Sequence, residues 1–187
     1  NDQKKSLYEI NKDLKSNQKM FRLLQGDVGS GKTIVSLLAA YNVIKSGFQV
    51  AVMAPTEILA KQHFKLAKEI FDKKIKIEIL SSKSEYKEKK IITQKLVDNK
   101  IDIIFGTHAI FQKKIIFDKL GLIIIDEQHK FGVNQRKKLS DKGGNNCDVL
   151  LMTATPIPRT LTMTIYGDMD LSIIREKPQI RKPIRTY

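Results

Sequence analysis

The sequence predicts an α/β fold in which a mainly parallel β-sheet carries helices on both faces. Short apolar runs rich in Ile, Val and Leu alternate with longer segments whose apolar residues follow helical spacing. The apolar runs show no regular exchange of polar and apolar positions, which is typical of strands buried on both faces. Alternating strands and helices favour parallel pairing, because each helix can serve as the crossover between two strands.

Six apolar runs are the predicted strands. They comprise residues 22–25, 49–54, 76–80, 102–105, 120–125 and 148–152. All are shorter than an ordinary helix, and most are rich in β-branched residues. No internal repeat or low-complexity linker interrupts the pattern.

The segments between the strands carry helix signals. Residues 32–45 are apolar nearly all round, which predicts a buried helix that ends at Ser46-Gly47. Thr56 is placed to cap a second helix. The expected apolar face of that helix consists of Leu59, His63, Leu66 and Ile70. Residues 84–99 form a third candidate with a Lys- and Glu-rich outer face, and residues 135–139 a short fourth.

Length and composition indicate one globular domain. The chain has 187 residues, of which 41% are hydrophobic and 29% charged, enough for a sizeable core. No apolar run approaches the roughly 20 residues that span a bilayer, and the first residues do not resemble a signal peptide. Cys147 is the only cysteine, which excludes an internal disulfide and fits a reducing compartment. We therefore expect a cytoplasmic protein that has no membrane partner.

The net charge of +14 indicates a polyanionic partner. Basic proteins bind nucleic acid largely because neutralised phosphates release their counterions. A lysine-rich composition with solvated helix faces would give the same charge, so charge alone leaves both interpretations open.

A phosphate-binding loop follows the first strand. The residues Gly26-Asp27-Val28-Gly29-Ser30-Gly31-Lys32-Thr33 match the pattern G-x-x-x-x-G-K-[ST] in full. Glycines let the backbone wrap with its N–H groups inward, and the start of the following helix adds partial positive charge. In such loops the lysine reaches the β- and γ-phosphates and the hydroxyl coordinates Mg²⁺. We expect a nucleoside triphosphate here, with Lys32 and Thr33 in these roles.

Two carboxylates, Asp126 and Glu127, end the apolar run at residues 120–125. Ligands of open α/β sheets bind at the carboxyl ends of the strands, so Asp126 is expected to face the Mg²⁺ held by Thr33. Glu127 is placed to orient or deprotonate the attacking water. A capped turn would also carry such acids, and it is the upstream phosphate loop that favours the catalytic interpretation.

These motifs resemble those of superfamily 2 helicases, which have a RecA-like P-loop NTPase domain. Residues 126–129 read Asp-Glu-Gln-His, a D-E-x-H box. Further family motifs follow in order: Ala54-Pro55-Thr56-Glu57 looks like motif Ia, Gly106-Thr107-His108 like motif Ib, and Thr153-Ala154-Thr155 like motif III. Gln3 matches the glutamine that reads adenine in related helicases. The resemblance covers nearly the whole chain and implies ATP as the nucleotide.

Longer segments narrow the resemblance to the RecG family of bacterial helicases. Residues 126–133 and 152–161 carry it, and residues 166–170 fit the same family. RecG helicases regress stalled replication forks and migrate branched DNA, which implies roles in DNA repair and recombination. Translocases of the Mfd family remain the alternative, although they have a second Glu where Gln128 stands here. Lys130 replaces an arginine that is commoner in the family.

The resemblance also implies roles for single residues. Gln128 and His129 should couple the state of the γ-phosphate to a second motor lobe, and Thr153 and Thr155 should relay that coupling to DNA. A histidine capping nearby backbone, or a plain helix cap at Thr155, would explain the same residues structurally. The expected contacts to the DNA backbone are Pro55, Thr56, Thr107 and His108. In this interpretation His63 packs on the face of its helix.

The expected domain organisation is one lobe of a longer protein. Residues 1–174 would form the ATP-binding lobe, and residues 175–187 the start of a linker to a missing second lobe. By resemblance, a wedge domain that grips branched DNA would precede residue 1. The second lobe would supply an arginine that accelerates hydrolysis about 10³–10⁵-fold. The chain alone should therefore bind nucleotide weakly and hydrolyse it very slowly.

Two other classes of function remain open. The isolated chain could be a module that binds ATP and DNA without catalysis, which only an assay separates from an enzyme. A small-molecule kinase or a transporter ATPase would share the phosphate loop. However, neither needs the motifs at residues 54–57, 106–108 and 153–155, and the L-S-G-G-Q signature of transporters is absent from the sequence.

Overall fold

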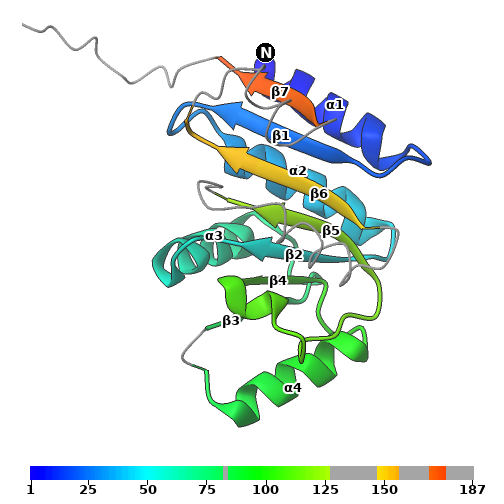
Figure 1. Cartoon of the computed structure of the whole chain (residues 1–187), viewed down its shortest axis with the longest axis vertical. Coiled ribbons are helices and arrows are strands. Elements are labelled where there is room, and N and C mark those ends of the chain that lie inside the picture. Colours follow the sequence, from blue (N-terminus) through cyan, green and yellow to red (C-terminus); the bar gives the residue numbers. More distant parts are fainter. Residues whose placement is uncertain (82–83, 127–146, 156–168, 176–187) are drawn as a thin grey trace, which may run out of the picture.

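The computed structural model describes residues 1–81, 84–126, 147–155 and 169–175. These residues form a seven-stranded sheet of order β3-β4-β2-β5-β6-β1-β7, and every strand pairing in it is parallel (Figure 1). The elements are α1 (Asp2–Leu14), β1 (Phe21–Gly26), α2 (Lys32–Lys45), β2 (Gln49–Met53), α3 (Glu57–Ile70), β3 (Ile77–Leu80), α4 (Tyr86–Val97), β4 (Ile103–Gly106), the 3₁₀ helix η1 (His108–Phe111), β5 (Leu120–Ile125), β6 (Asp148–Thr153) and β7 (Asp170–Ile174). The predicted parallel α/β fold is confirmed.

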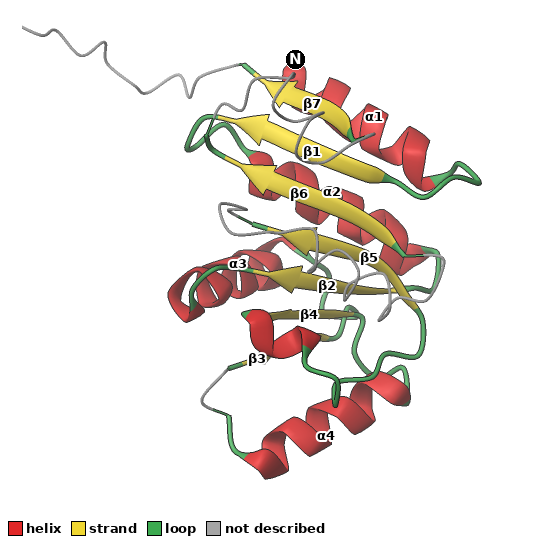
Figure 2. Ribbon diagram, in the orientation of Figure 1, coloured by secondary structure: helices red, strands yellow, loops and turns green. Residues whose placement is uncertain are grey.

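Helices pack on both faces of the sheet, as the sequence predicts (Figure 2). Leu24 and Ile124 point into a core shared with α1, α2 and α3. Their chain neighbours Leu23 and Ile123 point to the opposite face, where α4 and η1 cover the sheet. Successive residues of a strand face opposite sides, so apolar runs without alternation bury both faces at once.

All six predicted strands are present, and each observed bound lies within one residue of its prediction. The helix predicted at residues 32–45 also has the observed bounds of α2. Thr56 caps α3 as expected, since its side chain accepts a hydrogen bond from the Leu59 backbone N–H at 3.3 Å. The predicted apolar face of α3 is partly wrong. Its buried residues are Ala60, His63 and Ala67, whereas Ile70 at the last turn is exposed.

Three elements were not predicted, α1, η1 and β7, and a buried arginine joins α1 to β7. Arg22 of β1 is 7% exposed and pairs with Asp13 of α1 at 2.7 Å. Its guanidinium also donates to the Ser172 hydroxyl of β7 at 2.9 Å. That hydroxyl in turn donates to Glu9 of α1 at 2.5 Å. Because a buried charge needs partners, this network fixes α1 and β7 against the strand that leads to the phosphate loop.

A fully buried amide holds the other half of the sheet. Gln49, the first residue of β2, has no exposed surface. Its Nε2 donates to the carbonyls of Leu96 and Ile101, both at 2.9 Å. Its Oε1 accepts from the backbone N–H groups of Asp118 and Lys119 at 3.0 and 3.1 Å. One satisfied side chain thus joins the end of α4 to the segments that enter β4 and β5.

Among the described residues, no helix combines the length and the hydrophobicity needed to cross a membrane.

Candidate functional site

The predicted site residues lie at the carboxyl edge of the sheet. Gly26, Met53, Gly106, Ile125 and Thr153 end the strands β1, β2, β4, β5 and β6. Parallel strands bring these ends to one edge, where open α/β sheets bind their ligands. The two halves of the predicted site therefore lie at the same sheet edge, although 80 residues of chain separate Gly26 from Gly106 and the strands β6, β5 and β2 lie between β1 and β4.

The phosphate loop has the conformation that its glycines predict. Gly29 and Gly31 adopt positive φ angles of 82° and 90°. Gly31 is also the N-cap residue of α2, which has no side-chain cap. An uncapped helix start with the loop backbone wrapped before it is a suitable site for an anion. Thr33 is the second residue of α2, so its hydroxyl belongs to the same helix start.

Two polar side chains fill the interior of the loop. Lys32 lies across it and donates from Nζ to the carbonyl of Gly26 at 2.6 Å and of Asp27 at 2.9 Å. Ser30 is buried, and its Oγ has no hydrogen-bond partner within the described part of the chain. A buried hydroxyl without a partner is costly unless a ligand satisfies it. The donor set and the orphaned hydroxyl both suit a phosphate group.

Gln3 contacts this loop from helix α1. Its amide Nε2 donates to the carbonyl of Ser30 at 2.8 Å. A Cβ atom at position 31 would displace this amide, and the φ of 90° at Gly31 independently favours glycine there. The predicted role of Gln3 was to read adenine; the structure places it beside the loop and gives it a direct contact with the loop backbone.

Asp126, the predicted magnesium ligand, is held from two sides. Its backbone N–H donates to the carbonyl of Met53 at 2.9 Å. Its Oδ2 lies 2.7 Å from Nε2 of His63, and the two side chains are 13% and 11% exposed. The predicted packing of His63 on the face of its helix is confirmed by its burial, and the histidine also has a polar partner. Helical spacing correctly placed this histidine on the buried face, but it could not reveal a polar partner 63 residues away.

The four predicted DNA contacts lie together on adjacent strand ends. The backbone N–H of Ala54 donates to the carbonyl of Gly106 at 2.9 Å, which joins the segment before α3 to the segment before η1. Pro55, Thr56 and His108 are exposed, and Thr107 is half-buried. Exposed hydroxyls and helix N-termini at such an edge can donate to phosphates.

Thr153 and Thr155 form a tight turn after β6. The Thr153 hydroxyl accepts from the backbone N–H of Thr155 at 3.1 Å, and Thr153 is almost fully buried. In the parallel register Thr153 pairs with Gln25, the residue before Gly26. The predicted coupling segment thus lies directly beside the strand that carries the phosphate loop.

Several predicted features lie outside the described residues. They are Glu127, Gln128 and His129, the short helix at residues 135–139 and the linker beyond Arg175. Their predicted roles stay predictions. Arg175 itself is described, and its backbone N–H donates to Asp2 of α1 at 2.8 Å.

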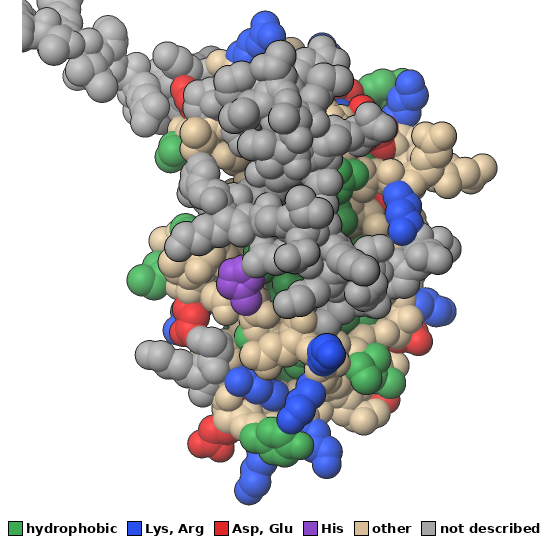
Figure 3. Space-filling model, in the orientation of Figure 1, with side chains coloured by type: hydrophobic (Ala, Val, Ile, Leu, Met, Phe, Trp, Pro, Cys, Tyr) green, Lys and Arg blue, Asp and Glu red, His purple; other side chains and the backbone are tan. Residues whose placement is uncertain are grey.

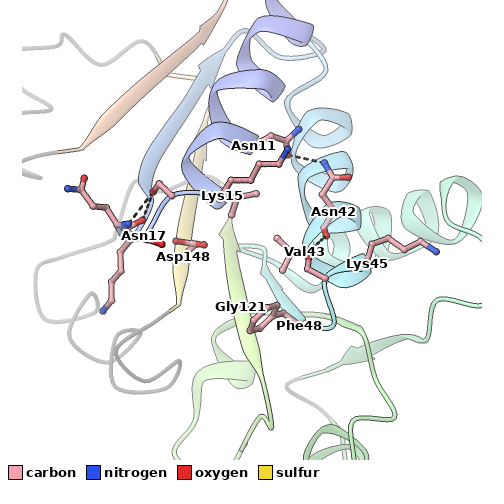
Figure 4. A pocket seen from close by; sticks show the side chains of 14 residues that line it. Asn11, Lys15, Asn17, Asn42, Val43, Lys45, Phe48, Gly121 and Asp148 are labelled. Carbon is pink, nitrogen blue, oxygen red and sulfur yellow. Dashed lines mark hydrogen bonds between the residues drawn. The ribbon is translucent and has the colours of Figure 1, made fainter.

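A cavity of about 660 Å³ lies at the opposite, amino edge of the sheet (Figure 4). It is bounded by the C-terminal ends of α1 and α2 and by the starts of β5 and β6, and Asn42 donates to Asn11 across one side at 2.9 Å. Its position away from the strand ends separates it from the phosphate loop and from Asp126, so it plays no part in the site.

Basic side chains are not confined to the strand ends. On the face drawn in Figure 3, Lys and Arg gather mainly toward the end of the molecule that carries α4. Lys87 and Lys90 of α4 are exposed there beside Glu85 and Glu88. The mixed charge of this helix fits the solvated face expected from sequence, so the net charge alone does not locate a nucleic-acid surface.

A family model described as "DEAD/DEAH box helicase" matches residues 1–164 of the chain. Two curated relatives are the ATP-dependent DNA helicase RecG of Streptococcus pneumoniae, 52% identical over 98% of this chain, and that of Bacillus subtilis, 51% identical over all of it. The chain spans 27% of the length of each of these relatives.

A solved structure described as RecG bound to a three-way DNA junction superposes on 98% of this chain with a TM-score of 0.81 and 42% identity. The match covers 24% of that chain. The fold is thus a RecA-like helicase fold, as the sequence predicts.

Proposed function

The chain belongs to the DEAD/DEAH box helicase family, and from this we propose that it is the ATP-binding lobe of a RecG-like, ATP-dependent DNA helicase. The longer protein would couple ATP hydrolysis to movement on duplex DNA and remodel branched DNA and stalled replication forks in repair and recombination. One observation carries the proposal: a complete phosphate loop lies at the same sheet edge as the clustered segments around Thr56 and Thr107.

The nucleotide would bind to the loop at residues 26–33. Phosphate oxygens would replace the carbonyls that Lys32 now contacts and would satisfy the orphaned Ser30 hydroxyl. Gln3 would support the loop and read the adenine edge. Thr33 and Asp126 are the groups that would hold Mg²⁺, which supplies positive charge against the β- and γ-phosphates.

Three residues after β5 would complete the chemistry. Glu127 would orient the attacking water and accept its proton. Gln128 and His129 would contact the second lobe, and Thr153 with Thr155 would pass the change to the DNA side. The register supports this last step, because Thr153 pairs with Gln25 next to the phosphate loop.

DNA would bind across the ends of β2 and β4, through Pro55, Thr56, Thr107 and His108. The exposed N-terminus of α3 adds partial positive charge toward a phosphate. These contacts touch backbone rather than bases, so they would hold duplex DNA without regard to sequence. Recognition of a branch would come from a wedge domain elsewhere in the longer protein.

We also propose the division at residues 174 and 175, with β7 as the last strand of the lobe and residues 175–187 as the start of a linker. Bacterial relatives that act on DNA with ATP suggest the cytoplasm as the place of action. A second motor lobe would supply the arginine that completes the site. In its absence the chain binds ATP but hydrolyses it very slowly.

Equilibrium binding of Mg-ATP to the chain tests the proposal. Lys32→Ala should abolish binding, because it removes the charge at the β- and γ-phosphates, whereas Lys45→Ala at the other end of α2 should leave it unchanged. A short forked duplex should bind to both variants as it does to the unchanged chain. Equal ATP affinity of the two lysine variants would contradict the assignment of the site.

A further inference from the structure

One hydrogen bond links the helix that begins at the proposed DNA contacts to the proposed Mg²⁺ ligand. It joins Nε2 of His63, on α3, to Oδ2 of Asp126, after β5, at 2.7 Å. Because a carboxylate oxygen can only accept, Nε2 carries the hydrogen. A short charge-assisted bond between two largely buried groups fixes the orientation of both side chains.

The rest of Asp126 is held independently. Its backbone N–H donates to Met53, whose neighbour in the sheet is Ile125. Strand β2 thus fixes the backbone of Asp126. Among the described contacts, only the one with His63 of α3 fixes the rotation of its carboxylate. With Oδ2 engaged by His63, Oδ1 is the oxygen left for a metal ion.

Helix α3 connects this carboxylate to an exposed surface. Thr56 caps the helix and is exposed, and Pro55 before it is exposed as well. His63 follows Thr56 by seven residues, which is about two helical turns along a rigid element. A small rotation or shift of α3 at its N-terminus would therefore move the imidazole against Asp126.

We propose that His63 is a positioning residue that couples DNA contact at the start of α3 to the geometry of the Mg²⁺ ligand Asp126. The inference rests on the proposed function, in which Asp126 holds Mg²⁺ and Thr56 contacts DNA. His63 touches neither nucleotide nor DNA. It sets the carboxylate in the orientation that the metal requires, and DNA stabilises that orientation by fixing the position of α3.

Such a coupling is reciprocal. If DNA increases the affinity for the metal–nucleotide complex by some factor, the metal–nucleotide complex must increase the affinity for DNA by the same factor. Residues that orient metal ligands typically change metal affinity about 10–100-fold when removed. A histidine that only fills the core would change the stability of the fold and leave both affinities in place.

The test measures binding, with Mn²⁺ as a spectroscopic stand-in for Mg²⁺. Mn²⁺ affinity of the chain with a non-hydrolysable ATP analogue is followed by electron paramagnetic resonance, with and without a short duplex. Nucleotide affinity in EDTA is measured in parallel. The variants are His63→Leu, His63→Gln and His63→Asn, and exposed Lys65→Ala on the same helix is the control.

His63→Leu should lower Mn²⁺ affinity about tenfold, remove the effect of duplex DNA, and leave metal-free nucleotide binding unchanged. His63→Gln should restore most of both effects, because its amide can reach Asp126 from a position close to that of Nε2. The shorter amide in His63→Asn should not restore them, because it does not reach the position of Nε2. Comparing the Gln and Asn variants therefore tests the positioning role even where the Leu variant fails to fold.

Two results would overturn the positioning role and leave the proposed function intact. One is that His63→Leu changes neither the Mn²⁺ affinity nor the effect of DNA on it. The other is that the Gln and Asn variants have equal Mn²⁺ affinities and equal DNA effects. Equal nucleotide affinity of the unchanged chain with the metal and in EDTA would instead contradict the proposed function, and the coupling with it.

Discussion

The backbone N–H of Ala54 donates to the carbonyl of Gly106 at 2.9 Å, and this bond brings the segments that begin α3 and η1 side by side. Position 106 also needs a bare backbone, because the end of β3 and the helix η1 pack closely against it. A Cβ there would lie 2.7 Å from the carbonyl oxygen of Leu80 and 2.8 Å from Cγ2 of Ile110. The proposed DNA surface is therefore built on a steric constraint at the end of β4.

Gly106→Ala should destabilise the chain by about 1–3 kcal/mol, the usual cost of forcing one extra carbon into a packed site. Urea unfolding measures the loss. DNA affinity should fall, since Thr107 and Ala54 must shift, whereas Mg-ATP affinity at β1 should stay. An unfolding midpoint equal to that of the unchanged chain would show that the neighbours give way freely.

Thr56 caps α3 and is also a proposed DNA contact, and one pair of variants separates these two roles. Its hydroxyl caps α3, so Thr56→Ala should cost about 1 kcal/mol of stability. Thr56→Asp keeps a good cap but places negative charge where a DNA phosphate is expected. The Asp variant should therefore keep the melting temperature and lose DNA affinity, most clearly at low salt. Undiminished DNA binding by Thr56→Asp would remove Thr56 from the DNA surface.

Gln3 should contribute to nucleotide binding through its contact with Ser30. Gln3→Ala removes a hydrogen bond of about 1 kcal/mol that holds the loop in its conformation, so ATP binding should weaken by at most roughly fivefold. The exposed neighbour Lys4 provides the control variant Lys4→Ala. A competition experiment between ATP and GTP measures whether Gln3 also contributes to base preference. If Gln3 reads adenine, the preference for ATP falls in Gln3→Ala; equal losses for both nucleotides would limit Gln3 to support of the loop.

The carboxyl of Asp148, at the start of β6, should make the stability of the fold depend on pH. Burial raises the pKa of this carboxyl, and the hydrogen bond from the Met20 N–H opposes the shift only in part. An acid whose pKa is higher in the folded than in the unfolded chain stabilises the fold at low pH, and this contribution is lost as the pH rises through the folded-state pKa.

Asp148→Asn should therefore be more stable than the unchanged chain at pH 7, with the advantage shrinking as the pH falls toward the ordinary Asp value of 3.8. Asp98→Asn is the control of opposite sign, because hydrogen bonds from Gln94 and Lys100 lower the pKa of that exposed carboxyl. Thermal melts of the three proteins across this pH range check the result. Parallel stability curves for Asp148→Asn and the unchanged chain would contradict it.

The sequence was most informative where a function depends on contiguous residues. The loop at residues 26–33 and the strand before Asp126 could be recognised because local spacing alone encodes a tight turn and a buried strand. Helix α1 was missed because it is mostly polar and its buried residues are few, Ser6 and Ile10. Strand β7 was missed because it lies at the sheet edge and only two of its five residues are buried.

Contacts between distant segments could not be predicted in the same way. The bond from His63 to Asp126 and the network around Arg22 each join elements that meet only after the sheet has formed. Helical spacing placed His63 correctly on the buried face of α3, but its partner depends on the position of β5 beside β2. Periodicity thus predicts which face is buried, and topology decides what the buried group contacts.

The central claim is that this lobe holds ATP but is an incomplete catalyst. Steady-state ATP hydrolysis by the chain, with and without forked DNA, tests it most directly. We predict binding that depends on Lys32 together with turnover near the background level in both conditions, because the arginine that would accelerate hydrolysis about 10³–10⁵-fold is expected from a second lobe. Fast turnover that does not depend on DNA would mean that the catalytic site is complete in this chain, and would contradict the account.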